Sequence, residues 1–157
     1  NGVINDCYTN GDVNAVMKGN AVFVSEYNGY FGGVVGANYG KVSYTYASGK
    51  VSGEQQVGGL VGYNEGTVSY SFAKGAVTST KDNWITKEWA GGLVGQNEGT
   101  VSNSYRSASQ NLNLADVECT AGTKATDSVI KSASFYKNNL KFSTSTWNIT
   151  SGLPTLR

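Results

Sequence analysis

Few side chains in this sequence have the types or the spacing that catalysis requires. The 157 residues contain no histidine, which excludes Ser-His-Asp and Cys-His arrangements and histidine-ligated metals. Glu65 and Glu98 occupy equivalent positions of a repeated block, where they could share a cation or lie separately in solvent. Polysaccharide-degrading enzymes need clustered carboxylates and remain the less favoured alternative. We expect no catalytic residue, no metal site and no cofactor.

Aromatic residues in two insertions are the candidates for ligand binding. The insertions, roughly residues 17–30 and 79–89, follow the same strand-like run in two repeats, so we expect the two loops to touch. The candidate residues are Tyr27, Tyr30, Trp84 and Trp89. Exposed rings stack on sugars and anchor protein interfaces, so a host glycan or an extracellular protein would suit them. The alternative is that the rings pack over the flank of the fold.

Cys7 and Cys119 are the only cysteines. Two thiols provide neither a disulfide framework nor a zinc cluster. If Cys7 belongs to the first repeat and Cys119 to the fifth, four rises of about 4.8 Å separate them. A disulfide allows at most about 7 Å between Cα atoms, so we expect both thiols to be free.

The elements that would position these residues follow an internal repeat. Three copies of a glycine-rich block begin at Gly32, Gly58 and Gly91 and read GGVVGANYG, GGLVGYNEG and GGLVGQNEG. The blocks are 26 and 33 residues apart, and the longer spacing is 26 plus an insertion of 7. The same continuation follows each block, most clearly as TVSYSFAKGAV after the second, and a first copy of it opens the chain.

Each 26-residue unit contains three strand-like runs, around Gly-Leu-Val-Gly, Thr-Val-Ser-Tyr-Ser-Phe and Ala-Val-Thr. Three runs with corners fit one turn of a triangular solenoid whose coils stack about 4.8 Å apart. We therefore predict an all-β fold, a right-handed parallel β-helix of four to five coils over residues 1–120. Asn38, Asn64 and Asn97 would stack at one corner, in left-handed backbone conformations and with bonded amides.

Two columns of valine and isoleucine should face inward. They are Ile4, Val42, Val68 and Val101, and Val13, Val51 and Val77. Two neighbouring columns leave the orientation open. One contains Cys7, Thr45, Ser71 and Ser104, and the other contains Tyr8, Tyr46, Phe72 and Tyr105. Alternation alone does not decide between them, and a corner between the columns could bury both.

The repeat decays after Arg106, and we predict that residues 121–157 cap the solenoid. A short helix should begin at Thr126 or Asp127. A solenoid has to cover its last open strand edges, or it polymerises end to end. Phe142, Trp147 and Leu153 are therefore expected to plug the open core.

The glycine-rich block resembles the GLUG motif family, named for its Gly-Leu-Val-Gly core, and the resemblance covers about residues 2–106. That family occurs in repetitive bacterial surface proteins, including adhesin-like proteins and the non-catalytic part of immunoglobulin A proteases. The resemblance implies a non-catalytic, adhesin-like rod module of a secreted or surface-anchored bacterial protein. It also implies an extracellular or cell-surface location and neighbouring repeats of the same polypeptide as contacts.

Charge and hydropathy exclude two other classes of partner. A net charge of +1, with Lys and Arg spread singly, gives no reason to expect nucleic acid. The longest apolar runs are far too short to cross a bilayer, so we expect no membrane insertion.

Overall fold

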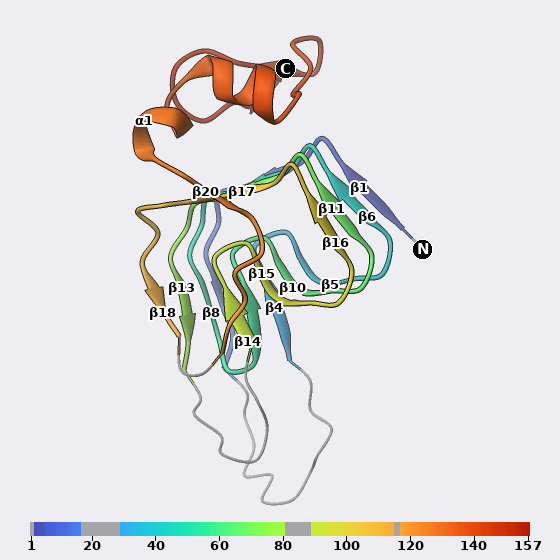
Figure 1. The fold of residues 1–157 in the computed structure, drawn as a ribbon, viewed down its shortest axis with the longest axis vertical. Coiled ribbons are helices and arrows are strands. Elements are labelled where there is room, and N and C mark those ends of the chain that lie inside the picture. The colour runs from blue at the N-terminus through green and yellow to red at the C-terminus, as the bar shows by residue number, and fades with distance from the viewer. Residues whose placement is uncertain (1, 17–28, 81–88, 115–116) are drawn as a thin grey trace, which may run out of the picture.

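The computed structural model describes residues 2–16, 29–80, 89–114 and 117–157. Nearly all of its regular structure consists of short β-strands of two to four residues, and the first twenty of these form parallel sheets (Figure 1). The predicted all-β class with parallel strands is therefore confirmed.

Five parallel sheets run through the stack, and each is named here after its strand in the second repeat. The β6 sheet contains β1 (Val3–Asn5), β6 (Lys41–Ser43), β11 (Thr67–Ser69) and β16 (Thr100–Ser102). The β7 sheet contains β2 (Tyr8–Thr9), β7 (Tyr46–Ala47), β12 (Phe72–Ala73), β17 (Tyr105–Ser107) and β20 (Thr123–Ala125). The β8 sheet contains β3 (Val13–Asn14), β8 (Val51–Gly53), β13 (Val77–Ser79) and β18 (Leu112–Asn113). The β9 sheet contains β4 (Tyr30–Gly32), β9 (Gln56–Gly58), β14 (Trp89–Gly91) and β19 (Val117–Glu118). The β10 sheet contains β5 (Val35–Asn38), β10 (Val61–Asn64) and β15 (Val94–Asn97).

Pairing follows the sequence repeat residue by residue. Val42 pairs with Ile4 of the preceding repeat and with Val68 of the following one, and Val68 pairs with Val101. The chain passes through the five sheets in the same order in the first three repeats. Equivalent residues of successive repeats therefore lie in columns perpendicular to the strands.

Each complete repeat contains five strands, not the three that the sequence predicts. The predicted Thr-Val-Ser-Tyr-Ser-Phe run divides into two strands because its fourth residue, Tyr44 or Tyr70, has a φ near +50°. Asp6 and Asn103 hold the same position and conformation in the first and fourth repeats. A left-handed residue costs about 1–2 kcal/mol outside glycine, and it turns the chain sharply here. The short strand β9 was not predicted.

The prediction of left-handed asparagines was wrong, because Asn38, Asn64 and Asn97 lack positive φ values. The glycines of the repeated block instead allow neighbouring backbone segments to approach closely. A Cβ on Gly62 would lie 2.5 Å from the Phe31 nitrogen and 2.6 Å from the Gly36 carbonyl oxygen. The β9 and β10 sheets therefore pack backbone against backbone, which side chains at these positions would prevent.

The interior of the stack is aliphatic. Its main buried cluster contains Val42, Ala47, Leu60, Val61, Val68, Ala73, Leu93 and Val94. A second cluster contains Val51, Val57, Val77 and Ala90. The members of the two predicted inward columns belong to these clusters or pack against them. Burying each such side chain contributes about 1.5–3 kcal/mol.

Both of the columns that the sequence left open are buried in their middle repeats. The hydroxyl of Ser71 donates to the Ser69 carbonyl at 2.8 Å and accepts from the Thr45 amide at 3.4 Å. Ser104 repeats this arrangement with Ser102 and Ser71. The hydroxyls thus provide hydrogen-bond partners for backbone amide and carbonyl groups at the corner. The Tyr46 and Phe72 side chains point the other way and are covered by the C-terminal segment.

The C-terminal segment contains the predicted short helix, α1 (Asp127–Ile130), followed by the π-helix η1 (Phe135–Asn139) and the antiparallel pair β21 (Trp147–Asn148) and β22 (Thr155–Leu156). It does not plug the core, contrary to the prediction. Figure 1 shows it beside the stack, and its buried residues pack on the outer face of the β7 sheet. Trp147 reaches the first repeat, where its Nε1 donates to Asp6 Oδ1 at 3.0 Å.

A different segment covers the end of the last repeat. After β19 the chain goes directly to β20 and crosses the end of the stack, where Cys119 and Ala121 pack against the main interior cluster. Arg106 occupies the column of interior Ala73, and its guanidinium binds Glu118 at 2.7 Å. The end of the core is therefore closed by the segment between β19 and β20 and by an ion pair.

Candidate functional site

Two of the four predicted binding residues, Tyr27 and Trp84, lie outside the described residues, as does the predicted contact between the inserted loops. Tyr30 begins β4 and pairs in register with Gln56. Trp89 precedes Ala90, which pairs with Val57, so Trp89 falls in the same column on the other side of Gln56. Both rings are half-buried. The structure therefore places Tyr30 and Trp89 two repeats apart in one column.

Tyr30 belongs to a cluster that the sequence did not reveal. Its ring stacks on Tyr63 with centroids 5.0 Å apart and an interplanar angle of 25°. Tyr39 meets Tyr63 edge to face at 6.0 Å. Tyr63 and Tyr39 lie within the glycine-rich blocks, which we interpreted only as strand and turn. A tyrosine two residues before Glu65 was the signal available in the sequence.

Two carboxylates complete this cluster. The Tyr63 hydroxyl lies 2.9 Å from Glu98 Oε2 and 3.4 Å from Glu65 Oε2. Gln96 donates from Nε2 to Glu98 Oε1 at 2.7 Å. We call the set the acidic tyrosine patch; it consists of Tyr30, Tyr39, Tyr63, Glu65, Gln96 and Glu98.

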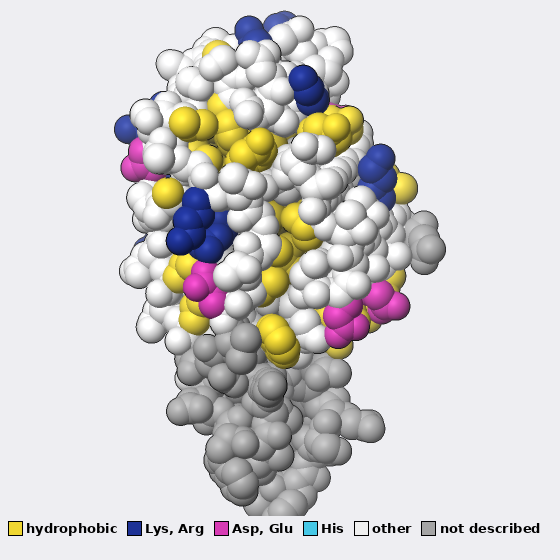
Figure 2. Space-filling model, in the orientation of Figure 1, with side chains coloured by type: hydrophobic (Ala, Val, Ile, Leu, Met, Phe, Trp, Pro, Cys, Tyr) yellow, Lys and Arg dark blue, Asp and Glu magenta, His cyan; other side chains and the backbone are white. Residues whose placement is uncertain are grey.

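The electrostatics of the patch are negative. Desolvation first, then the hydrogen bond and charge of Glu98, raise the pKa of Tyr63 well above its ordinary value. Neither Glu65 nor Glu98 forms an ion pair within the described part of the chain. Figure 2 shows acidic side chains gathered over the turns that follow the β10 sheet. The patch therefore presents ring surfaces and hydrogen-bond acceptors.

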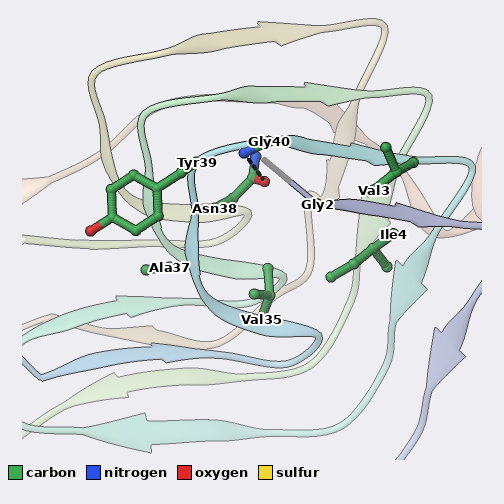
Figure 3. Close-up of a pocket in the computed structure, with 8 residues that line it drawn as sticks. All are labelled: Gly2, Val3, Ile4, Val35, Ala37, Asn38, Tyr39 and Gly40. Carbon is green, nitrogen blue, oxygen red and sulfur yellow. Dashed lines mark hydrogen bonds between the residues drawn. The ribbon is translucent and has the colours of Figure 1, made fainter.

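A pocket of about 340 Å³ opens at the first repeat (Figure 3). Val3, Ile4 and Val35 are apolar residues that line it, and Asn38 and Gly40 line it as well. Ile4 and Val35 are only partly buried, whereas Val42 and Val61, the equivalent residues of the next repeat, are fully buried. Among the described residues, the aliphatic interior is thus less covered at this end than at the end that residues 119–122 cross.

Hydrogen bonding also changes at the open end. In the second and third repeats, the Gly66 and Gly99 amides donate to the carbonyl oxygen of the asparagine one repeat earlier, at 3.0 and 2.9 Å. In the first repeat, the Gly40 amide donates to the side chain of its own Asn38 at 3.1 Å. The side chain of Asn38 thus supplies an acceptor that elsewhere comes from the preceding repeat.

The predicted asparagine ladder is confirmed. Asn38 Nδ2 donates to Asn64 Oδ1, and Asn64 Nδ2 donates to Asn97 Oδ1, both at 2.7 Å. Asn64, which is fully buried, therefore both accepts from the preceding repeat and donates to the following one. The asparagine Nδ2 groups also donate to backbone carbonyls, as Asn38 does to Thr67 at 3.2 Å, so the side-chain oxygens are the groups that depend most on the ladder.

Several other groups define the chemistry that the described residues offer. Cys7 and Cys119 are both free, as predicted, and burial raises the pKa of the Cys119 thiol. In the ranges that the structure describes, no three acidic, cysteine or histidine side chains converge as metal ligands. No helix among them has the length and apolar character to cross a membrane.

Comparison with known proteins gives one match. Residues 53–78 match the family model for the GLUG motif. This span runs from the end of β8 into β13 and so covers one full passage through the five sheets. No curated protein and no solved structure matches the chain.

Proposed function

We propose that this chain, which carries the GLUG motif, is a non-catalytic rod module of a secreted or surface-anchored bacterial protein. In this proposal the parallel sheets form a right-handed β-helix, and further repeats of the same polypeptide stack on its first repeat. The module acts as a spacer or adhesin-like stalk at the cell surface.

The observation that carries this proposal is the constant register across all five sheets. Equivalent residues pair from repeat to repeat, and insertions are accommodated between strands without changing the pairing, as in Val51 with Val13 and with Val77. Such an arrangement can be lengthened by adding identical units, because each repeat contacts only its neighbours. Its extent along the stack is then set by the number of repeats.

The two ends of the stack support growth in one direction. The last repeat is covered by residues 119–122 and by the Arg106–Glu118 pair. The first repeat presents the apolar pocket and the Asn38 amide. An added repeat would fill the pocket, donate from an asparagine Nδ2 to Asn38 Oδ1 and supply a carbonyl for the Gly40 amide.

The experiment is to insert a second copy of residues 40–65 between Asn1 and Gly2, which adds one repeat in register. The extended chain should unfold in a single transition at a higher temperature, because the pocket is buried. Its length in small-angle scattering should increase by about 4.8 Å. The matched control inserts the same residues in scrambled order. Equal melting temperatures for the two insertions would contradict the proposal.

The alternative prediction, binding of a glycan or host protein through the inserted aromatics, remains a second proposal. One described residue favours it, because Tyr30 contributes its ring to the acidic tyrosine patch. Trp89→Ala should weaken binding to host glycans or matrix proteins while leaving the unfolding temperature unchanged. A matching loss of stability would assign Trp89 to packing.

A further inference from the structure

We infer that the acidic tyrosine patch binds a guanidinium group, presented by an arginine side chain of a partner protein. This site would add recognition to a rod. It depends on the observed stacking of three repeats, and not on the proposed location or on growth of the stack.

The patch places a ring and two carboxylates in line. Asn38, Asn64 and Asn97 pair in register, so the residues that follow them, Tyr39, Glu65 and Glu98, succeed one another along the stack. Successive positions are about 4.8 Å apart. Tyr39 is 53% exposed, and both carboxylates are exposed. A planar guanidinium can stack on an aromatic face while its N–H groups reach neighbouring carboxylates.

Hydrogen-bonding capacity in the patch is dominated by acceptors. The Tyr63 hydroxyl and the Gln96 amide already direct donors at Glu98, and the remaining lone pairs of both carboxylates have no partner among the described residues. Gln56 joins this network by donating to Gln96 Oε1 at 3.3 Å. The Gln56 side chain is 9% exposed, and its Oε1 is a buried acceptor without a partner.

A ligand that only donates hydrogen bonds complements this set. Arginine carries five N–H donors and no acceptor, whereas sugar hydroxyls are both donors and acceptors and gain little from two negative charges. Calcium takes six to eight oxygen ligands, and the described residues contain no group of three acidic side chains. Lysine lacks the planar group that would stack on Tyr39.

The test is a titration of the ¹⁵N-labelled chain with N-acetylarginine methylamide, followed by amide chemical shifts. The shifts should concentrate at Tyr39, Glu65 and Glu98 and shrink as salt is added. The citrulline analogue, which keeps the shape without the charge, should bind at least about tenfold more weakly. Equal shifts with citrulline, or shifts spread over all carboxylates, would overturn the inference.

Substitutions locate the site. Glu98→Gln keeps an acceptor for the Tyr63 hydroxyl and should weaken arginine binding about tenfold. Tyr39→Ala should weaken it about threefold through the lost stacking. The control, Asp127→Asn, removes an exposed carboxylate of α1 and should change nothing. An unchanged affinity in Glu98→Gln, with a native spectrum, would refute the site. Tighter binding of a chitosan oligosaccharide would assign the patch to a glycan instead.

Discussion

The repeat stack and the C-terminal segment achieve cohesion in opposite ways. Between repeats the contacts are backbone ladders, asparagine amides, hydroxyls and small aliphatic side chains, and each contact recurs from repeat to repeat. The C-terminal segment depends on single large side chains. Those buried against the β7 sheet are Ile130, Phe135, Tyr136, Leu140, Phe142 and Trp147. A repeated contact leaves a period in the sequence, whereas a contact made once leaves none.

The largest loss of stability is expected from Trp147→Ala, in the C-terminal segment. The ring is fully buried, lies within about 6 Å of the Tyr8 and Tyr46 rings and stacks on Phe142. We expect a loss of about 3–5 kcal/mol in the free energy of unfolding, measured by urea denaturation followed by circular dichroism. Leu156→Ala, at an exposed position of the partner strand, is the control and should cost less than about 1 kcal/mol.

The corresponding change in the stack is Gly59→Val. A Cβ at this position would lie 2.2 Å from the Gly92 carbonyl oxygen of the next repeat, so the backbones of two repeats would have to separate. We expect a loss of about 2–3 kcal/mol in the same assay. A Cβ on Gly11 would have no neighbouring atom within 4 Å, and Gly11→Val should be nearly neutral. If the two substitutions had equal effects, Gly59 would not be needed for the close approach of neighbouring repeats.

Asn64→Leu tests whether the hydrogen bonds of the asparagine column stabilise the fold, as burial does in the apolar columns. The substitution removes the only partner of Asn97 Oδ1 among the described residues, and it leaves Asn38 Nδ2 with the Thr67 carbonyl at 3.2 Å. An unsatisfied buried polar group costs about 1–3 kcal/mol, and we expect a loss near 2 kcal/mol in calorimetry. Asn10→Leu changes an exposed asparagine and serves as the control. If Asn64→Leu stabilised the protein, the column would require a side chain of this volume and not its hydrogen bonds.

The smallest effect should come from Tyr46→Phe, which removes the hydroxyl that donates to the Pro154 carbonyl at 2.6 Å. We expect a loss of about 1 kcal/mol near neutral pH. Burial, and then the charge of Tyr8, raises the pKa of Tyr46 to about 12. The protonated hydroxyl is thus favoured in the folded state.

The stabilisation from this protonated hydroxyl is complete below the ordinary tyrosine pKa of about 10 and is lost as pH rises toward 12. The urea midpoint should therefore fall between about pH 9 and about pH 11.5, and fall less in Tyr46→Phe. Identical pH profiles in the two proteins would assign the alkaline loss to other tyrosines.

The sequence predicted what recurs. The parallel pairing, the inward valines and the asparagine ladder all depend on equivalent residues at fixed spacing, and the structure has them. The number of strands in a repeat was wrong for two reasons: Tyr44 and Tyr70 take a conformation that tyrosine rarely adopts and divide one run, and the short strand β9 was not predicted. Asp6 and Asn103 in the same column tolerate that conformation better and could have marked the corner.

Contacts that occur only once in the molecule could not be predicted from the sequence repeat. Phe142, Trp147 and Leu153 were predicted to plug the open core, but they pack on the β7 sheet, and that place follows from which face of Tyr46 and Phe72 is left uncovered. The acidic tyrosine patch is a similar case. Tyr30 and Tyr63 come from different strands and different repeats, and only the fold of β4 against β10 brings their rings together.

The reach of the C-terminal segment has a mechanical consequence. Its residues contact Tyr8, Tyr46, Phe72 and Tyr105, one from each of four successive repeats. A pull along the stacking axis would otherwise separate the repeats one at a time, breaking a few strand bonds at each step. Because the segment contacts the first four repeats, part of the pulling force would be carried by the segment and not by the strand pairs alone. Tension would have to shear its aromatic contacts before any single pair of repeats could part.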